Sequence, residues 1–232
     1  FHRLFIKTFW FWLPALFVKR ITVISQFSKG QVIRLIPFAE KKIEVIYNPV
    51  NSLLEYNPKN FNRTNPLILH LGTKTNKNLE RTIKALNGLK CRLLIIGELT
   101  EQQVQLLKQN EISYKNKKFL PFNEIKAAYE ECDMVSFVSL YEGFGMPIIE
   151  AQAVGRPVIS SNVTSIPEVA GDGAMLVDPA DVADIRSGIL KIIEDDQFRQ
   201  ELIARGQVNV KRFQIENIAA QYKELYEEVA NA

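Results

Sequence analysis

Residues 139–151 read Ser-Leu-Tyr-Glu-Gly-Phe-Gly-Met-Pro-Ile-Ile-Glu-Ala and join a predicted strand to a predicted helix. The apolar run 133–138 before them suits a buried strand, and Pro147 suits the first helical position, where its missing N–H costs nothing. Gly143 and Gly145 form the turn between the two, so a ligand can approach the backbone closely. The free N–H groups of a helix start favour an anion such as phosphate.

Two carboxylates flank this turn. Glu142 lies at its mouth, and Glu150 lies about one helical turn inside the predicted helix. Because a phosphate alone would repel them, we expect both to accept hydrogen bonds from hydroxyl groups, as on a sugar and a ribose attached to that phosphate. The structural alternative is that Glu142 caps a turn and Glu150 forms a surface ion pair. The spacing of two glutamates does not by itself decide between these interpretations.

The composition is that of a soluble globular chain of one or two domains, with 232 residues, 47% of them hydrophobic and 24% charged. A net charge of +3 is too small to indicate nucleic-acid binding. The two cysteines, Cys91 and Cys132, show no metal-type spacing and predict core residues in a reducing, cytoplasmic compartment. Without an Asp-x-Asp triplet, and with only His2 and His70, we expect no metal. His70 is expected to be a hydrogen-bonded core or rim residue.

Strand-like and helix-like patterns alternate after residue 58, which predicts an α/β fold with a doubly wound, parallel, Rossmann-like sheet and a helical C-terminus. Capping-box spacing is present at Thr100 with Gln103 and at Ser165 with Glu168. The predicted strands are 21–24, 42–46, 67–71, 92–96, a segment near 119 and 133–138. The predicted helices are 26–35 with Ser25 as cap, 79–86, 100–108, 124–130, a helix from 147, 181–194, 198–212 and 215–229.

The turn also resembles a known family signature. Glu142 and Glu150 have seven residues between them, and the intervening Gly-Phe-Gly-Met-Pro resembles the signature of retaining glycosyltransferases of family 4, which have the GT-B fold. Residues 46–50, 77–79, 154–159, 166–169 and 176–179 resemble further segments of that family. The similarity extends over roughly residues 20 to 230 and covers the family's C-terminal, donor-binding half plus the end of its N-terminal half.

The resemblance implies that the chain has three parts with different roles. Residues 1–50 would be a remnant of the N-terminal acceptor domain with the interdomain crossing, residues 51–212 the nucleotide-sugar-binding domain, and residues 213–232 a helix crossing back towards the N-terminal domain. Because the chain begins with Phe1, we expect a fragment of a longer product, with the rest of the N-terminal domain supplied in cis or in trans.

The resemblance also implies the roles of individual residues. Glu142 would contact the transferred sugar, Glu150 the ribose hydroxyls, and Lys77 the diphosphate, so that Glu142 and Lys77 serve catalysis. Where the family has an arginine directly after the glycine this chain has Thr73, and only Lys74 could compensate. The structural alternative for Lys77 is a solvated helix start, although a cation is slightly unfavourable there. The implied donor-binding residues are Gly72, Thr73, Lys74, Lys77, Leu120 near the base, Gly143, Phe144, Gly145, Met146 and Glu150.

The function implied by the resemblance is transfer of a sugar from a nucleoside diphosphate sugar to an acceptor hydroxyl with retention, without a cofactor or metal. The acceptor would be a glycan or a lipid-linked glycan. The alternative from another class is a non-catalytic sugar-nucleotide-binding module that pairs with a separate acceptor-domain polypeptide.

Residues 1–20 are rich in aromatic side chains flanked by basic ones. This pattern describes either a helix lying in a membrane interface, or a core-facing helix of the absent first half. The second interpretation is favoured, because the resembling family has a helix at this position. The first would place the protein peripherally at the inner face of the membrane.

Overall fold

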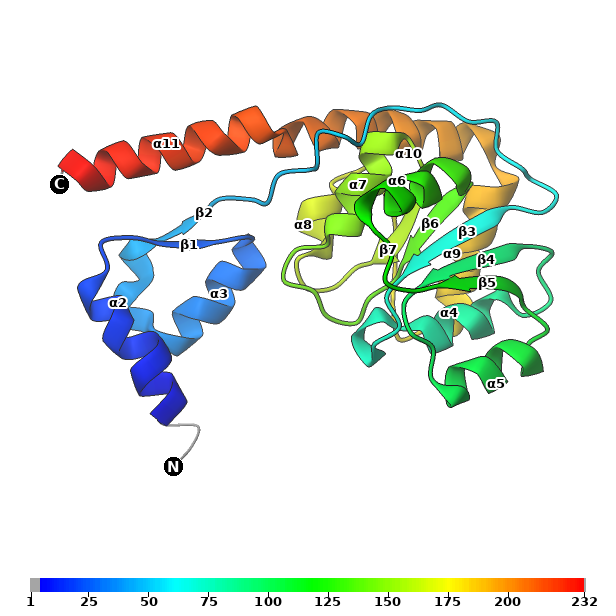
Figure 1. The fold of residues 1–232 in the computed structure, drawn as a ribbon, viewed down its shortest axis with the longest axis horizontal. Coiled ribbons are helices and arrows are strands. Elements are labelled where there is room, and N and C mark those ends of the chain that lie inside the picture. Colours follow the sequence, from blue (N-terminus) through cyan, green and yellow to red (C-terminus); the bar gives the residue numbers. More distant parts are fainter. Residues whose placement is uncertain (1–4, 232) are drawn as a thin grey trace.

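The structure is a computed structural model that describes residues 5–231; residues 1–4, with His2 among them, and residue 232 lie outside the described part. Figure 1 shows a six-stranded sheet with helices on both faces and, beside it, a small unit built on two strands. The last helix runs from the larger part back along the smaller one.

The larger sheet is wholly parallel, with the strand order β5-β4-β3-β6-β7-β8. From β3 the chain first adds β4 and β5 on one side and then returns to place β6 on the other. The predicted doubly wound fold is therefore confirmed, and the strand order reverses between β3 and β6. The strands are β3 Leu67–Leu71, β4 Arg92–Ile96, β5 Ser113–Lys117, β6 Met134–Phe137, β7 Val158–Ser161 and β8 Met175–Val177.

Helices cover both faces of this sheet, which explains the near-continuous apolar strands. Leu67 and Leu69 of β3 belong to the core under α6 and α7, whereas Ile68 belongs to the core under α4, α5 and α9. α10 contacts both α7 and α9. The helices are α4 Leu79–Leu86, α5 Glu101–Gln109, α6 Phe122–Glu131, α7 Met146–Val154, α8 Ile166–Ala170, α9 Val182–Glu194 and α10 Asp196–Asn209, with the short helices η3 Thr75–Lys77 and η4 Val210–Phe213.

The small N-terminal unit is built on two parallel strands, β1 Ile21–Val23 and β2 Ile43–Val45. Its core includes Ala15, Val23, Ile36, Ala39 and Ile43. The other elements of the unit are η1 Lys7–Trp12, α2 Leu13–Phe17, α3 Gln26–Leu35 and η2 Pro37–Lys42. The aromatic segment, residues 5–18, turns many apolar side chains outward; Phe17 is 80% exposed and Trp10 74%. In residues 5–231 no helix combines the length and hydropathy that crossing a bilayer requires.

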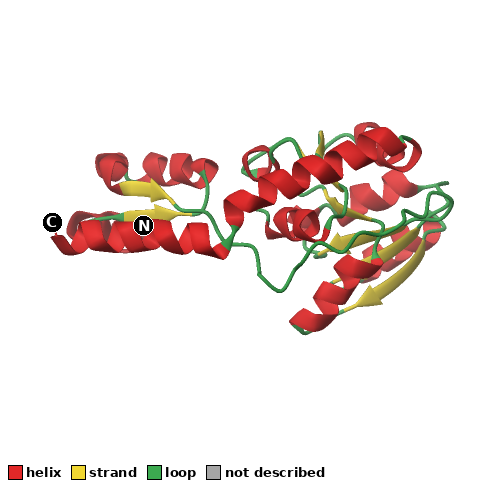
Figure 2. Ribbon diagram, turned by 90° about the horizontal axis from the view of Figure 1, so that it is seen from above, coloured by secondary structure: helices red, strands yellow, loops and turns green. Residues whose placement is uncertain are grey.

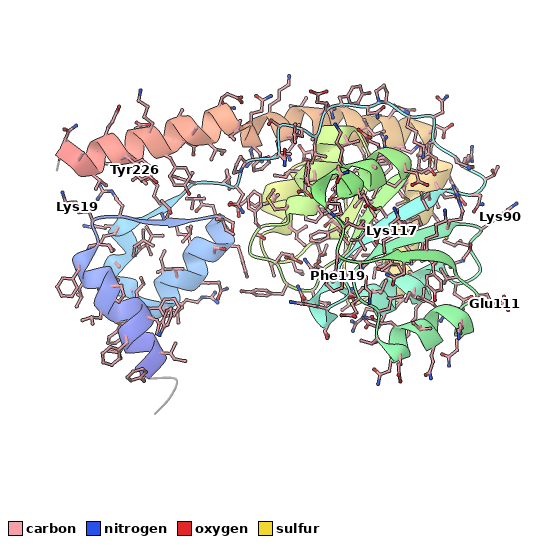
Figure 3. The ribbon with its side chains drawn as sticks, viewed as in Figure 1. Lys19, Lys90, Glu111, Lys117, Phe119 and Tyr226 are labelled. Carbon is pink, nitrogen blue, oxygen red and sulfur yellow. The ribbon has the colours of Figure 1, made fainter. Side chains whose placement is uncertain are left out.

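α11, Ile215–Asn231, returns along the N-terminal unit. Its side chains Ile218 and Leu225 are buried and pack with Ile46, which follows β2. The Lys19 Nζ donates a hydrogen bond to the Val229 carbonyl at 3.0 Å, and Lys19 and Tyr226 mark this contact in Figure 3. Two segments therefore connect the smaller unit to the larger one, namely the extended chain after β2 and the start of α11 (Figure 2).

Three local predictions need correction. The strand predicted near residue 119 ends at Lys117, because Phe119 adopts a left-handed conformation (φ 54°) that leaves its ring exposed (Figure 3). The helix predicted from Pro147 begins at Met146, so the proline is its second residue. The capping box at Thr100 and Gln103 is confirmed, but the one at Ser165 is wrong, because its hydroxyl bonds to another loop.

Candidate functional site

The loop after β3 is shaped to carry the Lys77 side chain. Gly72 has φ +89°, and a Cβ at this position would lie 2.7 Å from the Lys77 Cγ, so the lysine side chain lies directly across the glycine. At the end of the loop, Asn78 adopts a left-handed conformation with φ 61°. Its Nδ2 donates to the carbonyls of Val138 and Pro179 at 3.0 and 2.8 Å. These buried bonds fix the start of α4 and hence the position of Lys77.

The loop after β6 is held by its neighbours on both sides. The Leu140 N–H donates to the Asn76 carbonyl of the β3 loop at 2.8 Å. From the other side, the Ser165 Oγ lies 3.0 and 2.9 Å from the carbonyls of Glu142 and Phe144, which share its single hydroxyl proton. The loops after β3, β6 and β7 thus form one hydrogen-bonded unit at the carboxyl edge of the sheet.

Lys77 and Glu142 meet where the strand order reverses. The Lys77 Nζ lies 2.7 Å from the Glu142 Oε1, and the two side chains are 23% and 15% exposed. The same ammonium lies 4.8 Å from the centroid of the Phe137 ring. Because an ammonium has three donors, the bond to Glu142 leaves others for a ligand oxygen. In doubly wound sheets this edge is the usual ligand site.

Glu150 lies on α7 and has a different partner. The buried Tyr129 of α6 donates its hydroxyl to the Glu150 Oε2 at 2.7 Å. Burial raises the pKa of Glu150 above its ordinary value, and the hydrogen bond from Tyr129 opposes part of that rise. Within residues 5–231, no hydrogen bond joins Glu150 to Lys77 or Glu142.

The remaining predicted donor residues are less closely connected to this pair. The Thr73 Oγ1 donates to the Glu98 carbonyl at 2.6 Å, so this hydroxyl is directed to the loop after β4. Lys74 is exposed, whereas Leu120 and Met146 are half-buried. Phe144 is buried, with its ring centroid 5.7 Å from that of Phe213. The described chain contains no group of three or more His, Cys, Asp or Glu side chains placed to hold a metal ion.

His70 on β3 is buried, as predicted for a core residue. Neither ring nitrogen makes a hydrogen bond of good geometry within residues 5–231, although backbone groups of Gly72 and Ser136 lie close enough to influence its pKa. Burial, together with the positive charge of Lys77, lowers the pKa of His70 to about 4. The imidazole is therefore neutral at pH 7, and Lys77 brings the positive charge to this region.

Sequence reasoning missed a contact from the N-terminal unit to the β6 loop. The hydroxyls of Ser25 and Ser28 both donate to the Gly143 carbonyl, at 2.7 and 3.1 Å. Glu168 accepts hydrogen bonds from the Gln26 N–H and from the Tyr47 hydroxyl, at 2.8 and 3.0 Å. Ser25 does cap α3 as predicted, but its second bond spans 118 positions in the sequence and has no local signal. Tyr129 was missed for the same reason.

Comparison with known proteins identifies the family. The family profile described as glycosyl transferases group 1 matches residues 55–208. The O-antigen chain mannosyltransferase B of Escherichia coli is 30% identical over 228 residues, covering 88% of this chain and 59% of the relative. The O-antigen chain mannosyltransferase RfbU of Salmonella typhimurium is 28% identical over 209 residues, covering 86% of this chain and 57% of the relative.

Solved structures share the fold. The Anabaena protein Alr3699/HepE, solved in complex with UDP and glucose, superimposes with a TM-score of 0.81 at 21% identity, covering 94% of this chain and 65% of that one. A glycosyltransferase from Rickettsia africae has a TM-score of 0.80 at 20% identity, covering 97% of this chain and 67% of that one. This chain thus spans about three-fifths of the curated relatives described above. The extent of the profile match shows that the chain belongs to the glycosyl transferases group 1 family.

Proposed function

We propose that this chain is the donor-binding part of a glycosyltransferase that moves a sugar from a nucleoside diphosphate sugar to an acceptor hydroxyl. The observation that carries the proposal is the Lys77–Glu142 contact, which joins the loops after β3 and β6 where the strand order reverses. A half-buried cation beside a carboxylate suits a ligand that has both a diphosphate and sugar hydroxyls. Family membership supports the same reading.

The donor would lie across the carboxyl edge of the sheet. Lys77 would hold the diphosphate, with Thr73 and Lys74 beside it and Gly72 allowing close approach. Glu142 would bind the transferred sugar and Glu150 the ribose. The backbone around Gly143, Phe144, Gly145 and Met146 would bind phosphate and sugar oxygens, and the backbone at Leu120 would bind the base.

The mechanism we propose retains the anomeric configuration and uses no metal. The bond from the sugar C1 to the diphosphate oxygen breaks, the acceptor oxygen bonds to C1 on the same face, and the leaving diphosphate takes the acceptor proton. The Lys77 ammonium would stabilise the charge that develops on the leaving group. The curated relatives from E. coli and S. typhimurium are named mannosyltransferases, so mannose is our first candidate for the transferred sugar.

Calorimetry with UDP and GDP tests the donor site directly. Lys77→Ala should weaken binding of the preferred nucleotide by about tenfold or more, because a charge-assisted bond to phosphate is lost. Lys84→Ala on α4 is the matched control, because Lys84 is an exposed lysine of the same chain. An unchanged dissociation constant in the Lys77 variant would refute the assignment. Glu142→Ala should lower turnover more than nucleotide affinity.

A non-catalytic module that pairs with a separate acceptor polypeptide is the alternative function. The observation that favours it is Thr73, which stands where the resembling family has an arginine and whose hydroxyl donates to the Glu98 carbonyl. A radiolabelled-donor transfer assay, with and without an acceptor-domain polypeptide, distinguishes the two. Transfer to a glycan or lipid-linked glycan would support the enzyme, and donor binding without transfer in either condition would support the module.

The exposed aromatic segment supports a further part of the proposal. We place residues 1–50 with an acceptor domain supplied in cis or in trans, residues 51–212 with donor binding, and residues 213–232 as the helix that crosses back. The acceptor domain would cover the segment's outward side chains. Peripheral contact with the inner face of the cytoplasmic membrane is the competing proposal, and liposome co-sedimentation tests it: Trp10→Ser with Phe17→Ser should abolish sedimentation only if the segment enters lipid.

A further inference from the structure

Tyr129 is a buried residue that has no role among the residues proposed to bind the donor. Its side chain is fully buried in the core beneath α6 and α7, yet its hydroxyl donates to the Glu150 Oε2 at 2.7 Å. The tyrosine lies on α6 and the glutamate on α7, so this bond links two helices that flank the carboxyl edge of the sheet. Burial, with Glu150 beside it, raises the pKa of Tyr129, so the hydroxyl stays protonated and acts as a donor at neutral pH.

The two oxygens of the Glu150 carboxylate have different surroundings. Oε2 is bound by Tyr129, whereas Oε1 accepts no hydrogen bond from any residue in the described range 5–231. Glu150 is only partly exposed, and its Oε1 is not among the fully buried unpaired atoms, so a ligand can reach it. A carboxylate withdrawn from water without a second partner is costly, and a ligand hydroxyl would relieve that cost. Oε1 is therefore the oxygen available to a ligand.

We propose that Tyr129 is a positioning residue that fixes Oε2 of Glu150 so that Oε1 meets the ribose hydroxyls of the nucleotide. The inference rests on the proposed function, in which Glu150 binds the ribose. A glutamate carboxylate turns broadly about its last torsion, so a bond from a rigid neighbour is needed to hold one orientation. The phenol is such a neighbour, because its ring is packed on all sides.

A purely structural role for Tyr129 can be separated from this positioning role. Tyr129→Phe keeps the ring that fills the core and removes only the hydroxyl. The chain also offers a matched control, because the Tyr47 hydroxyl donates to the Glu168 Oε1 at 3.0 Å. Tyr47→Phe therefore removes the same kind of tyrosine–glutamate bond from a different carboxylate.

The experiment compares ribonucleotides with analogues that lack the ribose hydroxyls. UDP and GDP, each with its 2′,3′-dideoxy counterpart, are titrated by calorimetry into the wild type, Tyr129→Phe and Tyr47→Phe. We expect the wild type to prefer the ribonucleotide about tenfold or more, because hydrogen bonds to a charged carboxylate are lost in the analogue. Tyr129→Phe should reduce this preference to about threefold or less, and Tyr47→Phe should retain it.

The outcomes separate the inference from the function it rests on. A full ribose preference in Tyr129→Phe overturns the positioning role and leaves the proposed function intact. A wild type that binds UDP or GDP without any ribose preference overturns the ribose assignment of Glu150, and the inference with it. A wild type that binds neither nucleotide contradicts the proposed function itself.

A structure of the wild type with UDP or GDP gives a second test that does not depend on how the variant folds. The Tyr129–Glu150 bond should persist, with Oε1 within hydrogen-bond distance of the ribose. A carboxylate that turns away from Tyr129 to reach the nucleotide would overturn the inference.

Discussion

The loops at the carboxyl ends of β3 and β6 differ from the aromatic segment in how their side chains are satisfied. Lys77 and Glu142 of these loops bond to each other, and Ser165 of the loop after β7 bonds to the β6 loop. In the aromatic segment, Ala15 is buried, but Phe17 and Trp10 are mostly exposed. The loops therefore owe their composition to contacts within this chain. The exposed apolar side chains of the segment are those that our proposal assigns to contact with an acceptor domain.

The largest expected effect tests how tightly the β6 loop is packed. Phe144→Ala should lower the free energy of unfolding by about 3–5 kcal/mol, because a fully packed phenylalanine leaves a cavity. Phe144 is 3% exposed and packs against both Tyr47 and Phe213, which also contact each other. Phe17→Ala is the control and should change stability by less than about 0.5 kcal/mol. Equal losses in urea unfolding would show that the segment is buried in solution.

Gly72→Ala should have the next largest effect. Its positive φ costs about 1–2 kcal/mol for a residue with a Cβ, and the new methyl would displace Lys77 from Glu142. Gly88→Ala is the matched control, because Gly88 also has a positive φ (+72°) but open space around its Cβ position. Both variants should lose stability in thermal unfolding. Only Gly72→Ala should weaken UDP or GDP binding in calorimetry, and equal affinities would contradict this role of Gly72.

Ser165→Ala should have a smaller effect on stability. The loss of the one hydroxyl proton that the two loop carbonyls share should cost about 1 kcal/mol of unfolding free energy. Ser160→Ala is the control, because the Ser160 hydroxyl also donates to a buried carbonyl, that of Phe137, but does not hold the β6 loop. Hydrogen exchange of the amides of residues 141–145 should rise only in Ser165→Ala. Unchanged protection would show that the loop is held by other contacts.

The smallest effect is a dependence of nucleotide affinity on pH. Burial raises the pKa of Glu150, so acidification should protonate it at a higher pH than an ordinary glutamate. If the carboxylate binds ribose, affinity is full above the raised pKa and falls as the pH drops through it. Glu150→Gln removes this titration, so subtracting its calorimetric profile corrects for the phosphate of the ligand. Identical profiles in both proteins would contradict the ribose role.

Sequence patterns predicted β3, β4 and β6 of the larger sheet and the turn at Glu142, because those signals are local, whereas β5 was misplaced and β7 and β8 were indicated only by the family resemblance. Apolar runs and capping residues such as Thr100 depend on neighbours a few positions away. The resemblance implied only that Lys77 and Glu142 serve one donor; their direct contact, which crosses 65 positions, was not predicted.

Long-range partners could not be read from the sequence. Ser165 and Glu168 have capping-box spacing, but both bond to distant groups instead: Ser165 to the Glu142 carbonyl and Glu168 to the Gln26 N–H. His70 is buried beside backbone groups of Gly72 and Ser136, and no sequence pattern indicates how well its ring nitrogens meet them. The left-handed Phe119, likewise, ends a strand that its residue type would have continued.

Two segments join the smaller unit to the larger one: the extended chain after β2 and the start of α11 (Figure 2). Separating the two units would also break the hydrogen bonds of Ser25 and Ser28 to the Gly143 carbonyl and those of Glu168 to the start of α3. Because Gly143 belongs to the β6 loop, any such displacement would change the surroundings of that loop directly.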